Sequence, residues 1–177
     1  ECGEANAYYD PEYKQVVMCL EFISVISEEL APLADTVEQL TLWTEGAYAH
    51  IFYHEIGHAL IDILELPAVR KEEDAVDQLA ALVLLGSAEV EALDAAIAFL
   101  YITGTMQAHT VQQLPFWDEH SLGLQRAYDM MCLAYGYDQS HFATYLDFLP
   151  QERAQNCSHE YTRISSAWDA LLEPHLK

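Results

Sequence analysis

Basic residues are scarce in this chain of 177 residues. Lysine and arginine together number 7, against 29 aspartates and glutamates, so the formal net charge at pH 7 is -22. A nucleic-acid binder needs a basic footprint for phosphates, and a protein that docks on anionic lipid needs a basic surface. The composition therefore argues strongly against both classes, and it disfavours strongly acidic ligands.

Long apolar runs are also missing. The longest, at residues 95–106, is about twelve residues long and is interrupted by Thr103 and Gly104, so it predicts a buried helix and no membrane span. The chain begins at Glu1 and has no basic or apolar leader. Either a signal peptide has been removed or the sequence has been trimmed. We expect a secreted or periplasmic protein whose signal peptide has been removed.

Several ligand-binding motifs are absent as well. The sequence has no glycine-rich phosphate loop, no EF-hand loop, no Gly-x-Ser-x-Gly elbow and no Cys-x-x-Cys pair. Its four cysteines are widely separated: Cys2, Cys19, Cys132 and Cys157. An even number at wide spacing favours two disulfides in an oxidising compartment over four buried thiols. The spacing alone permits three pairings.

The composition is that of a globular protein, with 52% apolar and 20% charged residues. The length suits a single domain over residues 1–177. Near the N-terminus, an Asp10-Pro11 turn separates two short runs of strand-forming residues, which predicts a β-hairpin. A hairpin closed there brings Cys2 close to Cys19, so we prefer this pair, and Cys132–Cys157 for the other.

Helical patterns dominate the rest of the chain, so the predicted fold class is mainly α (α+β) with a small N-terminal β-hairpin. Prolines and glycines suggest where the helices end. The stretch at 103–118 is predicted to be a loop with short structured pieces. The predicted helices span residues 21–33, 36–64, 71–85, 90–101, 121–135 and 150–172.

The segment His54-Glu55-Ile56-Gly57-His58 lies inside the longest predicted helix. Residues four apart share one helical face, so His54 and His58 can direct ring nitrogens at one point about 2 Å away, as zinc requires. Glu55 is rotated by about 100° from His54, so it can reach a water at that point and act as general base. The flanking residues are apolar, and the alternative of two core histidines is weaker because buried polar groups need partners.

A catalytic zinc usually has three protein ligands and one water. The next predicted helix opens with acids, and Glu73 and Asp77 lie four apart on an otherwise apolar stripe. We predict Glu73 as the third ligand and Asp77 as a hydrogen-bond acceptor for a ligand histidine. Glu72 competes for the ligand role and Asp74 does so more weakly; both also suit the helix dipole.

This pair of motifs resembles the gluzincin metallopeptidases, in which a Glu-x-x-x-Asp element follows the His-Glu-x-x-His helix. More closely, nearly the whole chain is similar to a bacterial metallopeptidase family whose function is unknown. The family usually has alanine where this chain has Val76. The segments that carry the resemblance are Cys2-Gly, Asn6-Ala-Tyr-Tyr-Asp-Pro11, Cys19-Leu-Glu-Phe, residues 53–62, residues 72–78, Phe116-Trp-Asp-Glu-His-Ser121, Gln125-Arg126, Arg153-Ala, Cys157, Tyr161 and Trp168.

The resemblance implies a zincin-like helical domain with Zn²⁺ held by His54, His58 and Glu73, and with Glu55 as general base. The oxyanion that forms on the substrate needs a further stabiliser. We select His120, oriented by Asp118, with Tyr128 as the alternative. The spacing of the other five histidines does not indicate metal binding, and we interpret them as surface or core residues: His50, His109, His141, His159 and His175.

The expected function is therefore zinc-dependent hydrolysis of a peptide or protein substrate. In zincins generally an edge strand pairs with extended substrate, and residues 13–19 could supply it, although the hairpin could equally be only a cover for the helices. Two alternatives remain at this point. One is a non-catalytic zincin-like binding protein; the other is a zinc hydrolase of a non-peptide amide or ester. The sequence indicates neither the oligomeric state nor the substrate's identity.

Overall fold

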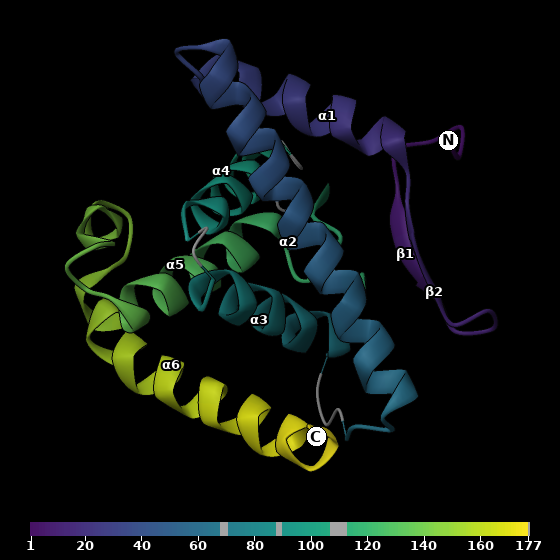
Figure 1. Ribbon diagram of the computed structural model, residues 1–177. Coiled ribbons are helices and arrows are strands. Elements are labelled where there is room, and N and C mark those ends of the chain that lie inside the picture. The colour runs from purple at the N-terminus through teal and green to yellow at the C-terminus, as the bar shows by residue number, and fades with distance from the viewer. Residues whose placement is uncertain (68–70, 88–89, 107–112, 177) are drawn as a thin grey trace.

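The computed structural model describes residues 1–67, 71–87, 90–106 and 113–176. The protein is mainly α-helical with one two-stranded antiparallel hairpin at the N-terminus (Figure 1), which confirms the predicted fold class. The hairpin consists of β1 (Ala7–Asp10) and β2 (Gln15–Met18). The helices are α1 (Leu20–Leu30), α2 (Val37–Ile63), α3 (Glu72–Leu85), α4 (Glu91–Met106), α5 (Gly123–Tyr137) and α6 (Gln151–Leu172), with short 3₁₀ turns at Ala31–Leu33, Ala143–Asp147 and Glu173–His175.

The hairpin forms where the sequence predicts it. Tyr8 pairs with Val17 in the antiparallel register. Asp10 closes the turn, because its Oδ1 accepts hydrogen bonds from the backbone N–H groups of Glu12 and Tyr13 at 2.9 and 3.1 Å. Lys14 completes the turn in the left-handed region, with φ of 52°. The strands lie beside α2 (Figure 1), so the hairpin covers one side of that helix.

Helix α2 begins at a side-chain cap and extends along the whole molecule (Figure 1). The Oγ1 of Thr36 accepts a hydrogen bond from the backbone N–H of Gln39 at 3.1 Å, which satisfies one of the free amides of the first turn. The helix packs against α1, α3 and α4. Two apolar clusters result: a small one between α1, α2 and α4, and a large one in which α3, α4, α5 and α6 meet.

Two disulfides fix the ends of this arrangement. Cys2 is joined to Cys19, which ties the N-terminus to the start of α1, and Cys132 is joined to Cys157, which ties α5 to α6. This is the pairing that the sequence predicts. Along the described part of the chain, no helix has both the length and the apolar character that crossing a membrane requires.

Helix α4 is longer than predicted. The expected loop from residue 103 is wrong at its start, because the helix continues to Met106. Thr103 is accommodated by a hydrogen bond from its Oγ1 to the carbonyl of Phe99 at 2.8 Å. Gly104 lies against Gly123, and a Cβ there would be 2.4 Å from the backbone nitrogen of Leu124. The glycine is therefore a close-packing position between α4 and α5. Residues 107–112 of the predicted loop, with His109, lie outside the described residues.

Candidate metal centre

The two histidines of the motif lie one turn apart on the face of α2 that meets α3. Their Nε2 atoms are 3.3 Å apart, and their rings meet edge to face. His54 is buried and His58 is partly buried. The helical spacing therefore directs both imidazoles at one point, as the sequence predicts.

Glu73 reaches the same point from the first turn of α3. Its Oε2 is 3.1 Å from Nε2 of His54, and its Oε1 is 3.4 Å from Nε2 of His58. One ligand atom from each of these three residues can be chosen so that all lie within 4.8 Å of one another. We call His54, His58 and Glu73 the metal cluster.

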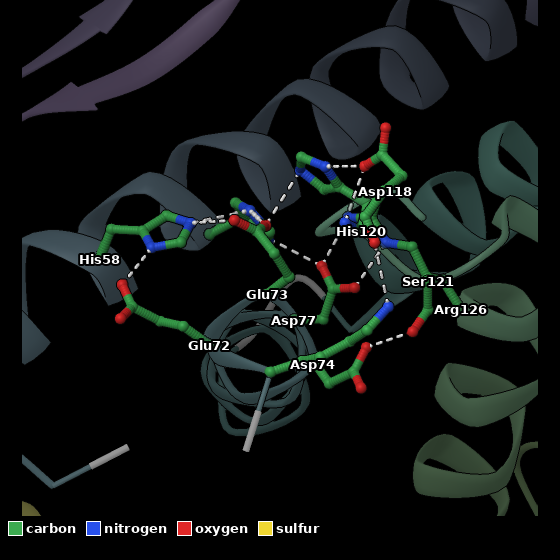
Figure 2. A network of polar contacts seen from close by, with 11 residues as sticks. His58, Glu72, Glu73, Asp74, Asp77, Asp118, His120, Ser121 and Arg126 are labelled. Carbon is green, nitrogen blue, oxygen red and sulfur yellow. Dashed lines mark hydrogen bonds and ion pairs between the residues drawn. The ribbon is translucent and has the colours of Figure 1, made fainter. Parts of the chain in front are cut away.

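The other ring nitrogen of each histidine is held by a second carboxylate of α3. Nδ1 of His54 is 2.8 Å from Oδ1 of Asp77, and Nδ1 of His58 is 2.7 Å from Oε1 of Glu72. Figure 2 shows Glu72 and Glu73 extending toward His58 from the same helix turn. A carboxylate at Nδ1 favours the proton there and leaves the Nε2 lone pair for a cation. Glu72, which the sequence leaves open as a competing ligand, lies on the outer side of His58.

Arg126 of α5 supports this arrangement by binding the carboxylate of Asp77. Its Nε and Nη2 donate to Oδ2 and Oδ1 of Asp77 at 2.6 and 2.7 Å (Figure 2). Burial alone would raise the pKa of the Asp77 carboxyl, but the Arg126 guanidinium and His54 hold this pKa well below its usual range. Asp77 is only 6% exposed and is therefore a charged acceptor inside the protein. The sequence indicates no role for Arg126, because nothing in its spacing links it to a residue 49 positions earlier.

The carboxylates also determine the protonation of the cluster. Burial alone would lower the pKa of His58, but hydrogen bonds to Glu73 and Glu72 raise it to about 9. Burial likewise opposes the charged form of His54, and hydrogen bonds to Asp77 and Glu73 outweigh it and raise its pKa. The pKa of Glu73 is held far below its usual range, against burial, by the three histidines around it. A cation that enters the cluster thus meets an anionic carboxylate and displaces protons from the imidazoles.

Glu55 lies next to the cluster but has a different environment. It is 7% exposed and lines two neighbouring cavities. Within the residues that the structure describes, no hydrogen-bonding group contacts its carboxylate. A buried carboxylate with a free lone pair at a cavity wall is suited to bind water or to accept a proton.

His120 comes from the segment before α5 and lies at the edge of the cluster (Figure 2). Its Nε2 is 3.0 Å from Oε2 of Glu73, which raises its pKa, and its ring stacks on that of His54 at 6.2 Å. Asp118 accepts from the backbone N–H of His120 at 2.9 Å and lies 3.1 Å from its Nδ1. His120 is not part of the group within 4.8 Å. The alternative, Tyr128, packs against Tyr101 and is not among the described residues that line the two cavities.

An open groove of about 390 Å³ lies between the cluster and the hairpin. Its walls on the hairpin side come from Ala7, Tyr8, Tyr9 and Pro11, which belong to β1 and the turn. The sequence suggests residues 13–19 for the strand beside the site, and this is wrong: β2 pairs with the far edge of β1, so β1 faces the groove. The Tyr9 hydroxyl donates to Asp62 at 2.7 Å, which fixes the hairpin to α2.

The ligand atoms of the cluster indicate which metal ion it can bind. Two imidazole nitrogens and one carboxylate form a ligand set of catalytic zinc sites, whereas calcium and magnesium prefer oxygen ligands alone. Both imidazoles are oriented by a carboxylate at Nδ1, the usual support of zinc-binding histidines. The residues present therefore fit a zinc ion.

One family model matches residues 1–172 of the chain, and its description reads "Putative metallopeptidase". The chain matches no curated protein and no solved structure.

Proposed function

Since the chain belongs to the family described as "Putative metallopeptidase", we propose that it is a zinc-dependent peptidase in which His54, His58 and Glu73 hold the metal and Glu55 is the general base. One observation carries the proposal. Both Nε2 atoms and the Glu73 carboxylate converge within 4.8 Å, while carboxylates from α3 hold both Nδ1 atoms. A pair of core histidines has no need of three surrounding acids.

Zinc bound by these residues would supply Lewis acidity, which polarises a substrate carbonyl and acidifies water. The protein's own contribution begins at Glu55. Its unpartnered carboxylate accepts the proton of the attacking water and later delivers it to the leaving amine. A rigid position matters for this proton transfer, and the buried face of α2, to which Glu55 belongs, provides it.

His120 is the proposed second stabiliser of the oxyanion that develops on the substrate. The Glu73 carboxylate raises the pKa of His120, which favours the protonated ring as a hydrogen-bond donor at the edge of the cluster. Asp118 orients the ring from the opposite side. The half-exposed side chain also borders the groove, where a substrate can reach it.

The groove supports a peptide as substrate. Strand β1 borders the groove and is paired with β2 along its other edge, so an extended peptide can add to it by main-chain hydrogen bonds. The Tyr9–Asp62 hydrogen bond and the Lys14–Asp62 ion pair keep the strand at this position. The two disulfides favour an oxidising compartment, so we propose that the protein acts after secretion or in the periplasm.

The decisive experiment combines metal analysis with a variant that keeps the ligands. The purified protein should contain one zinc per chain and should cleave a casein-type protein or a peptide library. Glu55→Gln should keep the zinc and lose about 10²–10⁴-fold in kcat, the usual contribution of a general base. Glu45→Gln, an exposed position on the same helix, is the matched control and should behave like the wild type. Equal residual activity in the wild type and Glu55→Gln would overturn the proposal.

A further inference from the structure

A second cavity adjoins Glu55 and shares part of its wall with the groove. It encloses about 230 Å³ between α1, α2 and α4. Its walls are mainly apolar and include Phe22, Ala47, Ile51, Ala96, Phe99 and Leu100. Four residues line both this cavity and the groove: Ala7, His54, Glu55 and His120. The proposed catalytic residues therefore form the boundary between the two spaces.

The proposed reaction leaves two polar residues of this cavity without a role, Asn6 and His50, and Asn6 already accepts hydrogen bonds from the backbone N–H groups of Ala7 and Cys19. His50 lies one turn before His54 on α2, lines the cavity and is 3% exposed. Its Nε2 is buried and has no hydrogen-bond partner within the described part of the chain. Burial lowers the pKa of this ring to about 3, so the imidazole is neutral. A buried nitrogen without a partner costs about 1–3 kcal/mol, and native proteins keep few of them.

The cavity disfavours a charged occupant. Two basic side chains in its wall already have acidic partners: Arg126 donates two hydrogen bonds to Asp77, and His120 is paired with Glu73. Apolar walls make the burial of an unpaired ion costly. Phe22 and Phe99 meet edge to face with centroids 6.3 Å apart, and such rings accept a further aromatic ring well. The volume of the cavity lies below the range of about 300–1,000 Å³ that is usual for whole small-molecule ligands. The cavity is therefore the right size for a single side chain.

We propose that this cavity selects the substrate residue beside the scissile bond, and that it takes a tyrosine side chain. The ring packs against Phe22 and Phe99, and the hydroxyl forms a hydrogen bond with the neutral His50. The substrate would then extend along the groove, with one side chain passing Glu55 into the cavity. This assignment deepens the proposed function and rests on it.

Cleavage of matched peptides tests the assignment. The series carries tyrosine, phenylalanine, leucine, glycine or glutamate next to the scissile bond, on either side. The wild type should cleave the tyrosine peptide about tenfold faster in kcat/KM than the phenylalanine peptide, which is the scale of one hydrogen bond, and both should exceed glycine and glutamate by at least about tenfold. His50→Phe should equalise tyrosine and phenylalanine, and His50→Gln should retain the preference for tyrosine.

A filled cavity gives a second test. Ala96→Leu places a larger side chain in the cavity wall and should abolish the aromatic preference, while Ala98→Leu, outside the cavity lining on the same helix, should keep it. Equal cleavage of all peptides in the series, or a tyrosine preference that survives His50→Phe, would overturn the assignment.

Ligand binding separates this assignment from the proposed activity. N-acetyl-tyrosinamide should shift the NMR signals of residues around the cavity in the wild type, and its binding should be lost in Ala96→Leu but not in Ala98→Leu. N-acetyl-glycinamide should cause no such shifts. If no peptide is cleaved but these shifts appear, the peptidase proposal fails and the pocket stands. If peptides are cleaved but no shifts appear, the pocket assignment fails alone.

Discussion

Replacement of Asp77 by asparagine isolates the role of the charge beneath the metal cluster. The carboxylate contacts Nδ1 of His54 at 2.8 Å and two nitrogens of Arg126 at 2.6 and 2.7 Å. Asparagine has the same shape, but it offers one acceptor oxygen where the carboxylate offers two. Whichever way the amide is oriented, its NH₂ group faces a donor of His54 or Arg126.

The magnitude follows from burial and partner number. Asp77 is 6% exposed, so Arg126 loses its counter-ion inside the protein. Removal of one partner of a buried ion pair costs about 3–5 kcal/mol, and we expect a decrease of this order in the free energy of unfolding. The loss of the carboxylate that orients His54 should weaken zinc binding by about 10–100-fold.

Two measurements check Asp77→Asn: chelator competition for the zinc dissociation constant, and urea unfolding of the metal-free protein. Asp74→Asn is the matched control, because Asp74 lies on the same helix and accepts one hydrogen bond, from Ser121 at 2.6 Å. It should stay within about threefold of the wild type in zinc affinity and lose at most about 1.5 kcal/mol. Wild-type zinc affinity and stability in Asp77→Asn would refute the reasoning.

Three further predictions concern the same region. Glu73→Gln should abolish zinc binding, whereas Glu72→Gln should weaken it only about 10–100-fold because Glu72 orients His58 from the side; equal losses in chelator competition would contradict this difference. Zinc affinity should fall as the pH drops below about 9, by about tenfold per pH unit for each proton that zinc displaces, because Glu73 and Glu72 hold the pKa of His58 at about 9. Calorimetry in buffers of different ionisation enthalpy counts the displaced protons. Zinc binding without proton release at pH 7 would be inconsistent with this prediction. Gly57→Ala should destabilise the fold by about 1–3 kcal/mol, since the new Cβ would lie 2.7 Å from Cβ of Val76; urea unfolding should show recovery when Val76→Ala is added, and a double variant no more stable than Gly57→Ala would argue against this contact.

Local patterns made the fold class and part of the site predictable. The spacing of His54 and His58 is converted directly into a shared helical face, and the hairpin turn at Asp10 is encoded in neighbouring residues. The spacing to Asp77 favours Glu73 as the third ligand but leaves Glu72 open, because adjacent residues in the first turn of a helix can both reach a neighbouring helix. Their separation into an outer and an inner position depends on how α3 packs on α2.

Other features depend on contacts between distant segments. Arg126 reaches Asp77 only because α5 packs against α3. Gly104 suggests the end of a helix by its conformational freedom, yet its role is to let α4 approach Gly123. His50 has the same four-residue spacing to His54 as His58 has. Its side chain nevertheless lines a mainly apolar cavity, whose walls include residues of α1 and α4.

A crystal structure of the zinc-loaded protein, with anomalous data at the zinc edge, tests the central claim most directly. We predict one zinc with two imidazole nitrogens at about 2.0–2.1 Å, from His54 and His58, one oxygen of Glu73 at about 2.0–2.2 Å, and a water as the fourth ligand. A zinc bound elsewhere, or a fourth ligand supplied by the protein, would contradict the account.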